Sequence, residues 1–148
     1  MKWLRVSILL LSLQAVSGRP QAPDTAVRFE TVDVFVDTTD KALAAYQLEF
    51  FSAAGGAKIA GIEGGAHPAF ATPPYYDPKA MQQDRVILAA FTTDDAGALP
   101  VGKTRVATIH LQTTGTNLPD FQIRLQAAAD AAGRTITAEA TFQERNTK

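Results

Sequence analysis

Short stretches in which apolar and polar residues alternate recur from residue 27 to residue 142. A period of two is typical of β-strands with one buried face, because successive side chains point to opposite faces of the sheet. These strand-like stretches are residues 27–37, 44–51, 58–63, 85–91, 104–113, 121–127 and 135–142. Glycine, proline and acidic turn residues separate them. The pattern predicts an all-β fold, a single β-sandwich or jelly roll.

The stretches differ in how many faces they should bury. In residues 44–51, Tyr46, Leu48 and Phe50 share one face, while Gln47 and Glu49 take the other. This predicts a strand that is open to solvent on one side. Residues 85–91 (RVILAAF) are almost wholly apolar. They predict a strand that is covered on both faces.

Length and composition exclude several classes of protein. The chain has 148 residues, which suits one domain. It has no cysteine, so disulfides, cysteine metal sites and thiolate catalysis are excluded. The formal net charge is -1 at pH 7. Such a balance indicates neither a nucleic-acid partner, which requires a basic surface, nor a polybasic membrane anchor.

The first 18 residues have the order of a signal peptide. Lys2 and Arg5 precede an apolar stretch of about 11 residues, and Val16-Ser17-Gly18 supplies small residues for cleavage. A spanning helix needs roughly 20 apolar residues, so no membrane span is expected after cleavage, although retention of the segment as an anchor stays open. We expect a secreted, periplasmic or cell-surface protein.

This gives four segments along the chain. Residues 1–18 are the signal peptide and residues 19–26, which contain Pro20 and Pro23, form a flexible lead-in. Residues 27–143 form the sandwich, and residues 144–148 form a tail. Cleavage would remove two basic residues and no acidic one, leaving 12 basic against 15 acidic residues, a net charge of -3.

The chain carries no recognisable catalytic or cofactor motif. Ser52 lies in Phe51-Ser52-Ala53, without the glycines of a nucleophile elbow. The two histidines, His67 and His110, have no metal-ligand spacing. Acidic turns at residues 37–40 and 92–95 could bind calcium, but solvated turns are the simpler interpretation. We therefore predict no enzyme activity, no metal and no cofactor.

One segment between the strands is unusual. Residues 67–78 contain four prolines and the aromatic residues Phe70, Tyr75 and Tyr76. One interpretation is a rigid loop that covers the core with Phe70 and a tyrosine. The other is a contact surface, because tyrosine supplies a large contact area at low entropic cost.

Three late strands carry polar residues on their non-core side, where a partner could bind. These residues are Thr108, His110 and Gln112, then Gln122, Arg124 and Gln126, then Thr137, Glu139 and Thr141. Ordinary solvation explains such alternation equally well. Because most of them are uncharged, we take His110, Gln112, Arg124, Gln126 and Glu139, with Tyr75 and Tyr76, as candidate binding residues. Local patterning does not say whether the three strands share one sheet.

The order of these stretches resembles the cohesin domain, a jelly-roll module of bacterial surface proteins. The stretches that carry the resemblance are Leu43–Phe50, Lys58–Gly65, Arg85–Phe91, Leu99–Gly102, Arg105–Leu111 and Ala129–Ile136. Together they span most of residues 27–142. Cohesins dock a protein partner, the dockerin, through a flat sheet face. The resemblance therefore implies a cohesin-like sandwich that binds another protein, with a polysaccharide as the alternative because related sandwiches bind carbohydrate.

Overall fold

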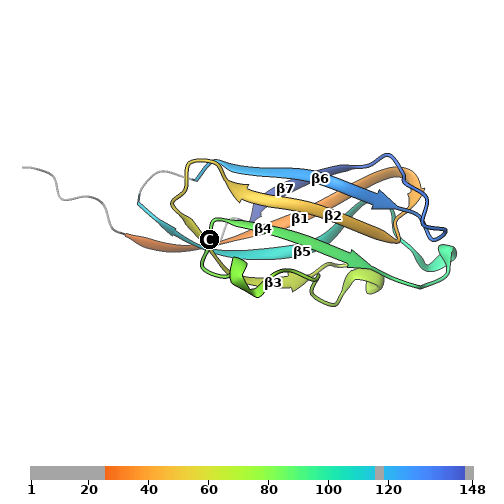
Figure 1. Cartoon of the computed structure of the whole chain (residues 1–148), viewed down its shortest axis with the longest axis horizontal. Coiled ribbons are helices and arrows are strands. Elements are labelled where there is room, and N and C mark those ends of the chain that lie inside the picture. The colour runs from red at the N-terminus through yellow and green to blue at the C-terminus, as the bar shows by residue number, and fades with distance from the viewer. Residues whose placement is uncertain (1–25, 116–118, 146–148) are drawn as a thin grey trace, which may run out of the picture.

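In a computed structural model, described here for residues 26–115 and 119–145, the chain forms two antiparallel β-sheets layered on each other (Figure 1). Sheet A has the strand order β3-β5-β1-β7, with bounds Ala57–Gly64, Val101–Thr114, Val27–Ala42 and Glu139–Arg145. Sheet B has the order β4-β2-β6, with bounds Arg85–Phe91, Ala45–Ser52 and Phe121–Ala129. The predicted all-β sandwich is confirmed.

The core lies between the two sheets and follows the predicted alternation. Sheet A contributes Val32, Val34 and Val36, each fully buried. Sheet B contributes Leu48 and Phe50, also buried. The ring of Phe50 packs against those of Phe121 and Phe142, with centroids 5.3 Å and 5.8 Å away. Each such side chain stabilises the fold by about 1.5–3 kcal/mol through burial.

The ends of the domain differ slightly from the prediction. The predicted signal peptide, residues 1–18, and residues 19–25 of the lead-in lie outside the described residues. The last strand, expected over residues 135–142, runs instead from Glu139 to Arg145. Before it, Thr135 makes only an isolated bridge to Ala129. The sandwich thus extends two residues past 143, and residues 146–148 of the predicted tail lie outside the described part.

The proline-rich segment closes the side of the sandwich between β3 and β4. It contains two short 3-10 helices, η1 (Pro68–Phe70) and η2 (Pro78–Ala80), while a third, η3 (Ala96–Ala98), precedes β5. Phe70 is buried and packs edge-on against Tyr46 at 5.4 Å. The backbone N–H of Gln82 donates to the carbonyl of Ile59 on β3. Phe70 therefore covers the core, as the first interpretation of this segment predicts.

The glycine pair that follows β3 serves close packing between chain segments. A Cβ on Gly64 would lie 2.0 Å from the carbonyl oxygen of Ala71, and one on Gly65 would lie 2.3 Å from that of Arg105. The backbone N–H of Gly65 donates to the carbonyl of Phe70. Only glycine allows these approaches. The pair therefore seats the start of the proline-rich segment against the sandwich.

The prediction for the most apolar strand was wrong. We expected β4 to be covered on both faces, but its outer face is open. Val86 and Leu88 point into the core and are buried. Ile87 is 39% exposed and Phe91 is 63% exposed. The apolar residues on the two faces of β4 therefore have different roles. Those on the inner face build the core, and those on the outer face need a separate explanation.

Candidate binding surface

The outer face of sheet B has an apolar floor of small side chains. Ala45 on β2 lies between its cross-strand neighbours Phe91 on β4 and Ala129 on β6. We call Ala45, Ala89, Ala127 and Ala129 the alanine floor. Because these side chains are short, they leave a shallow depression of about 270 Å³. Alternation along the strands produces it, since the adjacent residues Tyr46, Leu88 and Ala128 fall on the core side.

Two exposed aromatic rings rise at one side of the alanine floor. Tyr75 and Phe91 stack with ring centroids 6.1 Å apart and an interplanar angle of 12°. Tyr75 is 70% exposed. Its backbone is fixed by a pair of hydrogen bonds with Ala89, of 2.7 and 3.0 Å, which extend sheet B beyond β4. The stacked rings are therefore held by the sheet, and together with the alanine floor they form a contiguous apolar area.

A charged cluster lies on the same face, further along the strands. The carboxylate of Glu49 accepts hydrogen bonds from Nε of Arg85 on β4 and from a terminal guanidinium nitrogen of Arg124 on β6. Glu49 is only 5% exposed although it points away from the core. The guanidinium of Arg124 also lies over the ring of Phe51, 5.7 Å from its centroid. We call Glu49, Arg85 and Arg124 the sheet B triad.

A pair of amides lies between the alanine floor and the sheet B triad. The side-chain amide of Gln47 on β2 donates to the side-chain oxygen of Gln126 on β6. Both side chains are exposed, and Gln126 lies at a β-bulge, where the register shifts between Gln47 and Leu48. The face therefore changes from apolar to amide to charged along the strands. Such a gradient suits a partner with both apolar and polar groups.

The structure does not bring the predicted binding residues together. His110 and Gln112 on β5 and Glu139 on β7 belong to sheet A, whereas Arg124 and Gln126 belong to sheet B. The core lies between the sheets, so these two groups face opposite sides of the molecule. Tyr75 joins the sheet B face through its bridge to Ala89. Tyr76 is partly buried and packs against the core.

The outer face of sheet A is mostly polar, although Phe29 on β1 is 71% exposed there. His110 lies 3.0 Å from Glu63 through Nε2 and 3.4 Å from the Thr31 hydroxyl through Nδ1. Lys103 lies over the ring of Phe35. Each of these polar side chains has a partner within its own sheet. This arrangement agrees with a solvated face.

A second charged cluster lies on sheet A. Asp33 accepts hydrogen bonds from Arg145 and from Thr108, and Arg105 lies 3.8 Å away. Burial raises the pKa of Asp33, but the hydrogen bonds from Arg145 and Thr108 and the charges of Arg145 and Arg105 outweigh it. The pKa therefore lies below its usual value. We call Asp33, Arg105 and Arg145 the sheet A triad.

Ser52 and Asp130 each stabilise a local turn. The Ser52 hydroxyl donates to the carbonyl of Gly55. Asp130 accepts from the backbone N–H groups of Ala132 and Arg134, so it closes a turn. Among the described residues, no three His, Cys, Asp or Glu side chains gather as metal ligands, and residues 37–40 continue strand β1.

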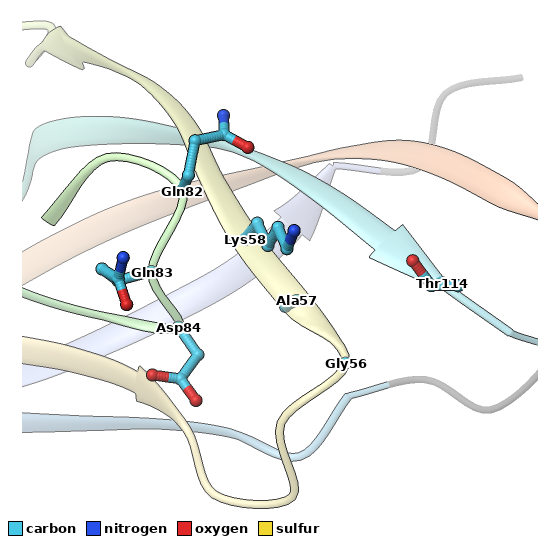
Figure 2. Close-up of a pocket in the computed structure, with 7 residues that line it drawn as sticks. All are labelled: Gly56, Ala57, Lys58, Gln82, Gln83, Asp84 and Thr114. Atoms are coloured by element: carbon cyan, nitrogen blue, oxygen red, sulfur yellow. The ribbon is translucent and has the colours of Figure 1, made fainter.

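A further hollow of about 270 Å³ lies between the start of β3 and the segment that precedes β4 (Figure 2). Its polar lining includes Lys58, Gln82 and Asp84, all exposed. Figure 2 shows the side chains of Gln82 and Asp84 pointing away from each other. Because these groups do not converge, the hollow offers weaker grounds for a site than the face of sheet B.

Sequence patterning missed the most informative residues of the surface. Ala89 and Phe91 were assigned to a covered strand, and Glu49 was treated as an ordinary outward residue. A signal was nevertheless present. A strand that is apolar on both faces is either covered on both sides by the protein itself or leaves one apolar face for a partner. In this fold, β4 has the second arrangement.

Comparison with protein-family models, with curated proteins and with solved structures finds no match. The described part of the chain contains no helix of the length and hydropathy needed to cross a membrane.

Proposed function

We propose that this chain is an exported, non-enzymatic protein-binding module that docks its partner through the outer face of sheet B. The observation that carries the proposal is the contiguous apolar area formed by the alanine floor and the stacked rings of Tyr75 and Phe91. An exposed apolar patch with a polar surround is typical of a surface that a partner covers. The signal-peptide pattern of residues 1–18 supports export to the cell surface or the periplasm.

The shape and composition of this face support a protein partner. Tyrosine and phenylalanine beside a floor of small residues can receive an apolar side chain, while glutamines and arginines around them supply hydrogen bonds. The resemblance to cohesins points the same way, because cohesins dock their partners through a flat sheet face. A surface with an apolar centre and a polar surround is the usual organisation of protein interfaces.

A polysaccharide is the second candidate, and one observation favours it. Tyr75 and Phe91 present exposed rings beside the amides of Gln47 and Gln126. Sugars stack on such rings and bond to such amides. Affinity electrophoresis through gels that contain soluble polysaccharides separates the two candidates. Retardation that disappears in the Tyr75→Ala variant would favour the polysaccharide, and unchanged mobility would favour the protein partner.

A matched pair of variants tests the proposed face. Ala127 is exposed on β6 of sheet B and Ala60 is exposed on β3 of sheet A. We expect Ala127→Arg to weaken binding of the partner by about 1–3 kcal/mol, because it places a long charged side chain on the alanine floor. Ala60→Arg should leave the affinity unchanged.

The full chain serves as the affinity bait that purifies the partner from the source cells. Calorimetric titration then measures the affinity of each variant for that partner. Both variants should unfold at the parent's temperature, since neither alanine is in the core. Loss of affinity in Ala60→Arg with full affinity in Ala127→Arg would place the interface on sheet A and contradict the proposal.

A further inference from the structure

The buried carboxylate of Glu49 on an outward face is an unusual feature of this fold. The side chain of Glu49 is 7% exposed, whereas those of Arg85 and Arg124 are 59% and 67% exposed. Each arginine uses one nitrogen for Glu49. A guanidinium has five N–H donors, so most donors of both arginines remain directed to solvent. The carboxylate therefore holds two arginines in place without saturating them.

Stability alone does not account for this arrangement. The attraction within a buried ion pair is largely offset by the cost of removing the charges from water. A well-packed apolar residue at position 49 would serve the sheet equally well. What the sheet B triad does provide is two arginines with restricted geometry on a flat surface, and pre-ordered side chains lose less entropy on binding.

The charge of this face has the opposite sign to that of the chain. Two arginines oppose one glutamate, and the other outward side chains of β2, β4 and β6 are neutral. The face therefore carries a charge of +1, while the whole chain carries -1. Complementary potentials guide association and select partners. An acidic group is the complementary partner for these arginines, since guanidinium pairs with carboxylate through parallel hydrogen bonds.

We infer that the partner presents an acidic protein segment, with an aspartate or glutamate that binds Arg85 and Arg124 and a nearby apolar side chain that lies on the alanine floor. This inference rests on the proposed function and specifies the chemistry of the partner. The sheet B triad and the alanine floor lie at different positions along the same strands, so the partner segment must carry both the acidic group and the apolar side chain. Neither alone covers the face.

The molecule supplies its own control. The sheet A triad also places one carboxylate between two arginines, but among the described residues no alanine floor lies on its face. A partner attracted by charge alone would bind both triads. A partner that needs the apolar contact as well would bind only the triad of sheet B.

Synthetic polymers of defined composition test the inference on the full chain. The probe is a random copolymer of glutamate and tyrosine, and the comparison polymers are a copolymer of lysine and tyrosine and polygalacturonate. NMR follows the Nε–H signals of Arg85, Arg124, Arg105 and Arg145 and the methyl signal of Ala129. We expect the glutamate copolymer to shift Arg85, Arg124 and Ala129 only. Arg85→Ala and Arg124→Ala should each weaken its binding about tenfold, while Arg145→Ala changes it less than about twofold.

Each other outcome overturns the inference. Equal losses in Arg124→Ala and Arg145→Ala would mean attraction by charge alone, and equal binding of the lysine copolymer would remove the acidic preference. Binding of polygalacturonate but not of the glutamate copolymer would indicate an acidic polysaccharide. Shifts at Ala129 that persist in both arginine variants would reject the acidic segment yet leave sheet B as the docking face. Absence of binding by every polymer would reject the segment chemistry, and the calorimetric test with the native partner decides the docking face separately.

Discussion

The two outer faces of the sandwich carry the same type of charged cluster in different surroundings. Each places one carboxylate between two arginines, Asp33 on sheet A and Glu49 on sheet B. On sheet A the carboxylate also accepts from the hydroxyl of Thr108, and neighbouring polar groups pair with one another. On sheet B the amides of Gln47 and Gln126 come next, and the alanine floor and the stacked rings of Tyr75 and Phe91 lie beyond them on the same face.

This contrast indicates what distinguishes a docking face from a solvated one in a β-sandwich. Charged and polar side chains occur on both faces, so their presence carries little information. The apolar neighbours carry more, because an uncovered apolar area is costly in water and becomes favourable when a partner covers it. On this view the sheet A triad serves stability and the face of sheet B serves binding.

The largest difference in stability should separate two phenylalanines in neighbouring strands of sheet B. Phe50 is 1% exposed in the core and Phe91 is 63% exposed on the outer face. Phe50→Ala should lower the free energy of unfolding by about 3–5 kcal/mol, because it removes a large side chain and leaves a cavity. Phe91→Ala should change it by no more than about 0.5 kcal/mol. Urea unfolding measures both, and a large loss in Phe91→Ala would mean that this ring belongs to the fold.

A smaller effect should follow pH on sheet A. The folded state lowers the pKa of Asp33, so ionised Asp33 stabilises the fold above its ordinary pKa of about 3.9. That contribution is lost as the pH falls through the lowered pKa of the folded state. In Asp33→Asn the free energy of unfolding should therefore fall less steeply with decreasing pH below about pH 5. An unchanged pH dependence in urea unfolding would show that the sheet A triad does not stabilise the fold.

The smallest effect on stability should come from the sheet B triad. In Glu49→Leu the two arginines, which are already well exposed, can turn into water. The free energy of unfolding should therefore change by less than about 1 kcal/mol. A loss of several kcal/mol in the same urea assay would assign Glu49 to stability and remove the contrast between the two triads.

Local patterning predicted the inward residues well and the neighbours of each strand poorly. Tyr46, Leu48 and Phe50 were correctly assigned to the core, because alternation fixes the face that a side chain occupies. Sheet membership depends on contacts between residues distant in sequence. For this reason the sequence did not reveal that Arg124 and His110 lie on opposite faces.

The docking face was also beyond local patterning for a physical reason. An apolar side chain such as Phe91 has the same composition whether another layer of the protein or a separate molecule covers it. The bridge that brings Tyr75 beside Phe91 joins residues 75 and 89 across the proline-rich segment and the turn before β4. No short-range signal specifies that pairing. Only the assembled sheet places the two rings together.

Site-specific photo-crosslinking tests the central claim most directly. A photoreactive amino acid replaces Ala127 on sheet B in one protein and Ala60 on sheet A in another, and both are illuminated in the source cells. If the partner docks on the outer face of sheet B, position 127 should form a discrete protein adduct and position 60 should form none. An adduct from position 60, with none from position 127, would contradict the account.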